Sequence, residues 1–146
     1  MARIRLIVAG SRTFKDYDFL KQKLDSLLIN VDLRDVAIVS GRAQGADRLG
    51  ERYAWEWGLL CIKRPAKWDI YGKAAGHIRN EEMARLATHA VIFWDGKSPG
   101  SKDMIALAER YHLRLRIVKV ECCEKVSRRV QENRRAVANL TVSSRL

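Results

Sequence analysis

At residues 36–47 the chain reads VAIVSGRAQGAD, and this segment indicates the fold class most directly. Its first half, Val36 to Ser40, is a short and continuously apolar run, as in strands whose sheet is covered on both faces. Its second half places Gly41 and Gly45 around the start of a segment with helical periodicity. A strand, a glycine turn and a helix in this order indicate a βαβ unit.

The same order repeats along the chain. Five apolar runs predict strands: Ile4 to Ala9, Val36 to Ser40, Leu59 to Lys63, His89 to Trp94 and Leu115 to Val120. Helical spacing predicts one helix that begins near Asp16 and others over about Gly45 to Trp57, Gly76 to Ala87 and Ser101 to Tyr111. The last strand alternates more than the others, which indicates an edge position. We therefore predict a single-domain, Rossmann-like α/β protein with a doubly wound, mainly parallel sheet of about five strands.

Length and composition set the limits of this domain. The 146 residues suffice for one hydrophobic core, which we assign to residues 1–120. Residues 121–146 form a basic extension in which Val126, Val130, Asn133, Val137 and Leu140 follow heptad-like spacing. This spacing predicts a helix that packs either on the domain or on a second subunit, so we expect a homo-oligomer.

Several classes of protein are disfavoured. The apolar run in the first ten residues, around Arg3 and Arg5, is far too short for a signal or membrane segment, so a cytoplasmic protein without a membrane partner is expected. The three cysteines and three histidines have no disulfide or metal-ligand spacing, and no metal or cofactor is expected. The formal net charge of +11 favours a phosphorylated or polyanionic partner, including nucleic acid.

The turns after the strands hold the candidate ligand-binding residues, because right-handed crossovers bring these turns to one edge of a parallel sheet. Glycines let a backbone approach a ligand, helix amino termini attract phosphate, arginines hold phosphate oxygens, and aromatic rings stack on bases. The predicted set is Gly10, Ser11, Arg12, Ser40, Gly41, Arg42, Gly45, Ala46, Asp47, Trp68, Tyr71, Arg79, Asn80, Trp94, Asp95, Gly96, Ser98, Gly100 and Ser101. For Trp68 and Tyr71 the alternative is that their rings only cover the sheet edge.

Taken together, these segments resemble the SLOG superfamily, named for the Smf/DprA DNA-processing proteins and the Lonely Guy phosphoribohydrolases, and most of all its YspA/YpsA-related branch. The resemblance runs from about Ile4 to Val120. It implies a Rossmann-like fold that binds nucleotides or nucleotide-derived ligands, including ADP-ribose-like signals, in systems tied to phage or mobile-element conflict. In the Lonely Guy enzymes an arginine and a glutamate split a base from a nucleoside monophosphate. Arg79 matches that arginine, and Asp103 lies where the glutamate motif falls, so these two residues are the catalytic candidates.

Three functions follow as alternatives. The favoured one is binding of a nucleotide or nucleotide-derived ligand, as a sensor, a sponge or an N-glycoside hydrolase in which Asp103 stabilises an oxocarbenium-like sugar or activates water. The second is single-stranded DNA binding, since DNA-processing protein A resembles this chain in its glycine turns and in the Arg79-Asn80 helix start. The third is an oligomeric scaffold with purely structural loops.

Overall fold

The computed structural model of this chain describes residues 2–121. The predicted helical extension, residues 121–146, lies outside the described residues except for Glu121. Within residues 2–121 none of the helices has the length and apolar character needed to span a bilayer.

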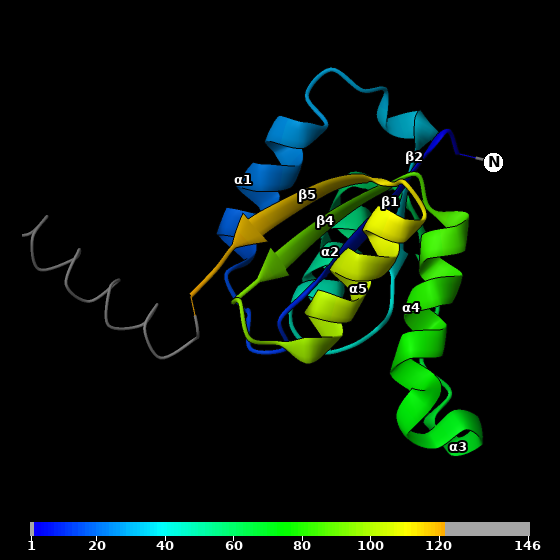
Figure 1. Ribbon diagram of the computed structural model, residues 1–146. Coiled ribbons are helices and arrows are strands. Elements are labelled where there is room, and N and C mark those ends of the chain that lie inside the picture. The colour runs from blue at the N-terminus through cyan, green and yellow to red at the C-terminus, as the bar shows by residue number, and fades with distance from the viewer. Residues whose placement is uncertain (1, 122–146) are drawn as a thin grey trace, which may run out of the picture.

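Five parallel strands form one sheet in the order β3-β2-β1-β4-β5 (Figure 1). The strands are β1 (Ile4–Gly10), β2 (Val36–Ser40), β3 (Leu60–Lys63), β4 (His89–Trp94) and β5 (Arg114–Lys119). The helices are α1 (Tyr17–Leu27), α2 (Ala46–Trp57), α3 (Trp68–Tyr71), α4 (Ala75–Leu86) and α5 (Pro99–Arg110), with short 3-10 turns at Leu33–Asp35 and Gly72–Ala74. The predicted Rossmann-like α/β fold is confirmed, and each of the five predicted strands is present.

Helices cover both faces of the sheet. Alternate residues of a strand point to opposite faces, so Leu6 and Val8 of β1 pack with α1 and α2, whereas Ile7 and Ala9 pack with α4 and α5. All four of these side chains are buried. This double cover explains why β1, β2 and β4 consist mostly of apolar residues.

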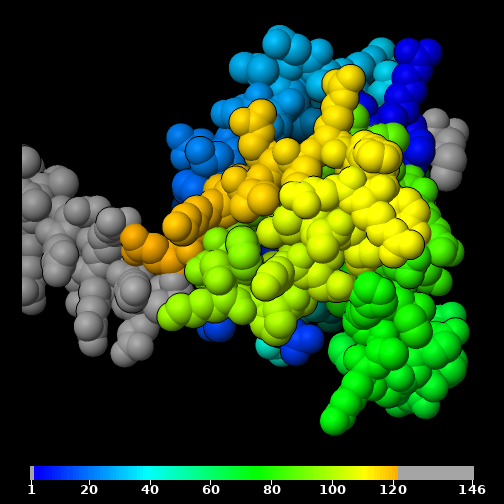
Figure 2. Space-filling view, in the orientation of Figure 1, coloured from blue at the N-terminus to red at the C-terminus, as the bar shows by residue number. Residues whose placement is uncertain are grey.

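The helix boundaries have local causes. Asp16 caps α1, since its carboxylate accepts a hydrogen bond from the Phe19 N–H at 3.1 Å. Gly58 ends α2 in the left-handed region, with φ of 65°, as expected for a glycine at a helix carboxyl terminus. The segment between β3 and α4, where no helix is predicted from the sequence, contains α3, and Figure 2 shows the green part of the chain projecting from the rest of the molecule.

The two edges of the sheet are β3 and β5. The alternating β5 is therefore an edge strand, as predicted. The strand order reverses between β1 and β4, because the chain moves from β1 to β2 on one side and returns to β4 on the other. Ligands of open α/β sheets bind in the crevice at such a reversal, outside the carboxyl ends of the strands.

Candidate functional site

A cleft of about 440 Å³ opens where the strand order reverses, and we call it the first hollow. Its walls come from the turn after β1, the loop after β2, the face of α4 and the start of α5. The lining residues are Ala9, Gly10, Ser11, Arg12, Thr13, Ala43, Asp47, Arg79, Asn80, Met83, Asp95, Ser98, Pro99, Gly100, Ser101 and Met104. Ten of the predicted ligand-binding residues therefore share one cleft.

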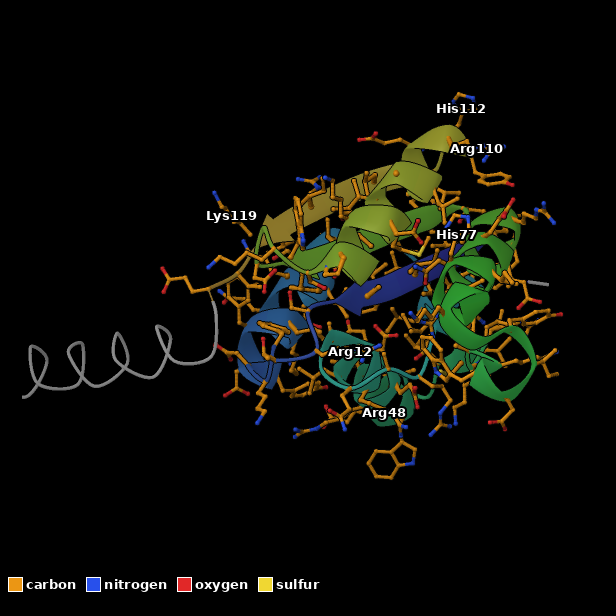
Figure 3. The ribbon with its side chains drawn as sticks, turned by 60° about the horizontal axis from the view of Figure 1, so that its bottom comes forward. Arg12, Arg48, His77, Arg110, His112 and Lys119 are labelled. Atoms are coloured by element: carbon orange, nitrogen blue, oxygen red, sulfur yellow. The ribbon has the colours of Figure 1, made fainter. Side chains whose placement is uncertain are left out.

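A second hollow of about 340 Å³ adjoins the first. Its lining residues are Arg12, Gly41, Arg42, Ala43, Gln44, Pro65, Ala66, Trp68 and Arg79. The two hollows share Arg12, Ala43 and Arg79, so these residues stand at the boundary between them. Figure 3 shows Arg12 beside the beginning of α2. The second hollow adds Gly41, Arg42 and Trp68 to the predicted residues that the fold brings together.

Seven predicted residues line neither hollow: Ser40, Gly45, Ala46, Tyr71, Trp94, Gly96 and Asp103. Some of them support the site from behind. The buried Ser40 hydroxyl accepts the Arg42 N–H at 3.1 Å and donates to Glu51 at 2.7 Å. The Trp94 indole N–H donates to the Ser98 carbonyl at 3.1 Å, which ties the end of β4 to the start of α5.

The apolar floor of the first hollow is missing from the sequence-based set. Met83 and Met104 line the hollow and are otherwise buried in the core under α4 and α5. Met83 lies three and four residues after Asn80 and Arg79, so helical spacing puts it on their side of α4. Helical spacing was therefore the available signal for Met83.

Arg79 is half-buried and held by neutral groups. It donates a close hydrogen bond to the Gly41 carbonyl, and its Nε donates to Asn80 Oδ1 at 3.0 Å. Burial lowers the pKa of Arg79; Asp47 opposes this effect and the positive charge of Arg12 adds to it. Within residues 2–121, the Arg12 guanidinium makes neither a hydrogen bond nor an ion pair. Two arginines therefore converge without a carboxylate bound to either, an arrangement suited to an anion.

Asp47 supports the loop after β2 from below. Its side chain is buried and accepts the Ala43 N–H at 3.2 Å. Burial raises the pKa of Asp47 to about 6. This carboxylate fixes the loop that separates the two hollows, at a cost in desolvation.

We expect Asp47→Asn to stabilise the fold most strongly above pH 6. The pKa of Asp47 is raised from 3.8 to about 6 by folding, so its stabilising contribution is complete below pH 3.8 and is lost as the pH rises through 6. Asparagine does not ionise and keeps an oxygen for Ala43. Urea unfolding should show the variant gaining about 2 to 3 kcal/mol on the wild type between pH 3.5 and pH 7.5. If the free energies of unfolding of the two proteins changed with pH in the same way, the raised pKa of Asp47 would be contradicted.

The start of α5 forms one wall of the first hollow. The Asp95 carboxylate accepts the N–H groups of Ser98 at 2.8 Å and of Lys97 at 2.9 Å, and these bonds lower its pKa. The Ser11 hydroxyl accepts the Asp95 N–H at 3.2 Å, which joins this turn to the end of β1. The first N–H groups of a helix lack intrahelical acceptors, so the amino terminus of α5 favours a negatively charged group.

Asp103, the candidate catalytic acid, faces α4. One carboxylate oxygen lies 2.8 Å from His77 Nδ1, and the other accepts the Asn80 Nδ2–H at 2.9 Å. Both partners belong to α4, and Figure 3 shows His77 on that helix. The structure therefore brings Arg79 and Asn80 to the cleft and leaves Asp103 between the two helices.

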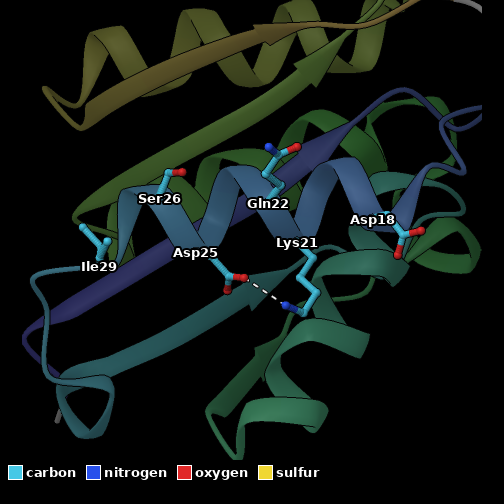
Figure 4. Close-up of a pocket in the computed structure, with 6 residues that line it drawn as sticks. All are labelled: Asp18, Lys21, Gln22, Asp25, Ser26 and Ile29. Carbon is cyan, nitrogen blue, oxygen red and sulfur yellow. Dashed lines mark hydrogen bonds and ion pairs between the residues drawn. The ribbon is translucent and has the colours of Figure 1, made fainter. Parts of the chain in front are cut away.

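A further hollow lies along α1, as Figure 4 shows. Its lining residues are Asp18, Lys21, Gln22, Asp25, Ser26 and Ile29. They come from α1 and the residues that follow it, and Lys21 is already paired with Asp25 at 2.9 Å. Groups from separate elements do not converge among these residues, so this surface has no features of a binding site.

The chain has detectable relatives. Residues 4–71 match the model of the YspA, cpYpsA-related SLOG family. The Gene 61 protein of Mycobacterium phage D29 is 28% identical over 116 residues, which are 73% of this chain and 89% of that protein.

Solved structures with the same fold include two DNA processing protein A (DprA) chains. The chain from Streptococcus pneumoniae matches with a TM-score of 0.65 and 18% identity, over 90% of this chain and 56% of its own length. The chain from Helicobacter pylori, studied for its single-stranded DNA binding mode, matches with a TM-score of 0.60 and 19% identity, over 80% of this chain and 65% of its own length. The present chain thus spans less than two thirds of either DprA chain, and the likeness shows the shared fold. The family model matches residues 4–71, so this part of the chain is similar to the YspA, cpYpsA-related SLOG family.

Proposed function

We propose that this protein binds a phosphate-bearing nucleotide derivative across the two hollows. One observation carries the proposal: Arg12 and Arg79 stand at the boundary of both hollows, and neither forms an ion pair within residues 2–121. Two guanidinium groups this close repel each other, and an anion between them removes that repulsion. Arginine also binds phosphate oxygens through paired N–H groups, which favours phosphate over a simple halide.

The remaining walls fit the other parts of a nucleotide. The first hollow offers the hydroxyls of Ser98 and Ser101 and the amide of Asn80 above an apolar floor, which suits a sugar with its hydroxyl groups. The second hollow offers Trp68, whose side chain is half exposed and able to stack on a base. The proposed pose therefore places the base and its ribose near Trp68 and the phosphates at the two arginines, and the first hollow would take the second sugar of an ADP-ribose-like ligand.

The proposal is for binding, as a sensor or a sponge. Cleavage of an N-glycosidic bond would need a carboxyl group at the reacting sugar carbon. Asp103 does not line either hollow, so its position gives no support to that reaction. The relative from a mycobacteriophage supports a role in phage or mobile-element conflict.

Single-stranded DNA binding is the second candidate. The DprA chain from Helicobacter pylori is described as binding single-stranded DNA, and the net charge of +11 suits a phosphate backbone. Figure 3, however, shows Arg110 and His112 at the far end of α5 from Arg12, so basic side chains are spread over the molecule. The arginine pair inside a two-part cleft favours a small ligand.

Thermal unfolding tests the proposal. With AMP, ADP and ADP-ribose at about 100 times the dissociation constant, the melting temperature should rise by about 5 to 10 °C, because the ligand binds the native state. Adenosine, which lacks phosphate, is the matched control and should give a much smaller rise. No rise with any phosphate-bearing compound, together with oligonucleotide binding that weakens steeply with salt, would overturn the proposal in favour of DNA binding.

A further inference from the structure

A continuous hydrogen-bonded chain runs from the surface of α4 to the cleft. His77 Nδ1 lies 2.8 Å from Asp103 Oδ1, and Asp103 Oδ2 accepts the Asn80 Nδ2–H at 2.9 Å. Asn80 Oδ1 then accepts the Arg79 Nε–H at 3.0 Å, and the guanidinium reaches the Gly41 carbonyl. These hydrogen bonds join α5, α4 and the loop after β2, three elements that are far apart in sequence.

Asp103 sets which groups donate and which accept along this series of hydrogen bonds. An ionised carboxylate only accepts hydrogen bonds, so the amide group of Asn80 must present its nitrogen to Asp103. The Gly100 carbonyl, 3.4 Å from the same Asn80 nitrogen, is also only an acceptor and favours the same orientation. The oxygen of the Asn80 amide is thereby directed at Arg79 Nε, which only donates.

We infer that Asp103 is a positioning residue, which acts through Asn80 to hold the Arg79 guanidinium at the boundary of the two hollows. The inference rests on the proposed function and narrows it: the carboxylate that the resemblance assigns to bond cleavage instead organises phosphate binding. One oxygen of the Asp103 carboxylate is engaged by His77 and the other by Asn80, and Asp103 lines neither hollow.

Burial makes the orientation of Asn80 important. Asn80 is buried, with 6% of its surface exposed, so solvent cannot easily satisfy a misdirected amide. Without the Asp103 carboxylate only the longer contact with the Gly100 carbonyl, at 3.4 Å, still holds the Asn80 nitrogen, so the amide can turn over and place that nitrogen against the Nε–H of Arg79, donor against donor. Arg79 would lose its hold on the α4 side and keep only the bond to the Gly41 carbonyl.

Ligand binding by two variants of Asp103 tests the inference. Asp103→Ala should weaken ADP binding at least tenfold in isothermal titration calorimetry. Asp103→Asn should recover most of the lost affinity, because its amide oxygen can still accept from Asn80. Lys102→Ala, which changes an exposed neighbour on α5, is the matched control and should bind like the wild type. A catalytic carboxylate predicts a different pattern, in which both Asp103 variants bind normally and both lose turnover.

A second measurement needs no ligand. Nitrogen-15 NMR can follow hydrogen exchange of the Arg79 Nε–H, with the signal assigned through its loss in Arg79→Lys. Exchange should be slow in the wild type and in Asp103→Asn, and at least tenfold faster in Asp103→Ala. Unchanged exchange in Asp103→Ala would overturn the positioning role. If the wild-type protein binds no phosphate-bearing nucleotide, the proposed function fails, and this NMR result still decides the role of Asp103.

Discussion

Arg79→Ala is expected to bind ADP at least about 100-fold more weakly than the wild type, because a charge-assisted hydrogen bond contributes about 1.5 to 3 kcal/mol and the guanidinium can supply two. The protein should remain folded. Arg79 forms no ion pair within residues 2–121, and its own bonds go to the Gly41 carbonyl and to Asn80. The loss of affinity should therefore greatly exceed the loss of stability.

Calorimetric titration with ADP, alongside urea unfolding of the same samples, measures both quantities. Arg85→Ala is the matched control, since it removes the same charge from the same helix. Arg85 bonds to Glu81 at 2.9 Å and to Tyr111 at 3.2 Å on the outer surface, and it lines neither hollow. Equal affinities of Arg79→Ala and Arg85→Ala for ADP would remove Arg79 from the site.

The fold was predictable because the sheet is covered on both faces. A strand buried on both sides reads as a continuous apolar run, and the predicted bounds of the strand at Val36–Ser40 and of the strand at His89–Trp94 match those observed. The edge strand Arg114–Lys119 alternates for the opposite reason, since more of its surface is exposed. Alternation makes this strand harder to recognise in the sequence, but it also indicated that the strand lies at an edge of the sheet.

Short elements were not predictable in the same way. The helix Trp68–Tyr71 has four residues, fewer than the repeat needed to show helical periodicity. Such a helix depends on its surroundings, because one turn is too short to be stable alone. Gly72, with φ of 54°, ends it in a conformation that a side chain would disfavour.

The position of the cleft at the edge of the sheet was predictable from the sequence. The orientation of each side chain around it was not. Parallel topology alone brings Gly10, Arg12 and Gly100 to one edge, because every crossover has the same hand. Whether a side chain there enters the cleft depends on tertiary partners. Asp103 turns toward α4 because His77 and Asn80 are there to donate to it, and neither partner is its neighbour in sequence.

Two predictions made from the sequence stay predictions. The ligand contacts assigned to individual residues await the binding measurements proposed above. The homo-oligomer was inferred from the spacing of Val126, Val130, Asn133, Val137 and Leu140, which lie outside the described residues. The residues that line both hollows all lie within residues 2–121.

Gly45→Ala is expected to destabilise the protein by about 3 kcal/mol or more, from backbone strain and steric overlap together. Gly45 precedes α2 with φ of 84°, where a side chain is strained. A Cβ there would lie 2.3 Å from the Ser11 carbonyl oxygen and 2.7 Å from the Arg12 Cα. That carbonyl also accepts the Ala46 N–H at 3.4 Å, so the turn after β1 rests directly on the start of α2.

Gly58→Ala separates the two causes. Gly58 also has a left-handed conformation, with φ of 65°, but a Cβ there would meet no atom within 4 Å. Its substitution should therefore cost only about 1 to 2 kcal/mol of backbone strain. Urea unfolding of both variants measures the difference. Equal losses of unfolding free energy would show that small shifts of the neighbouring atoms relieve the overlap at Gly45. Because relief of the overlap must displace the backbone of Arg12, Gly45→Ala should also weaken ADP binding, whereas Gly58→Ala should leave it unchanged.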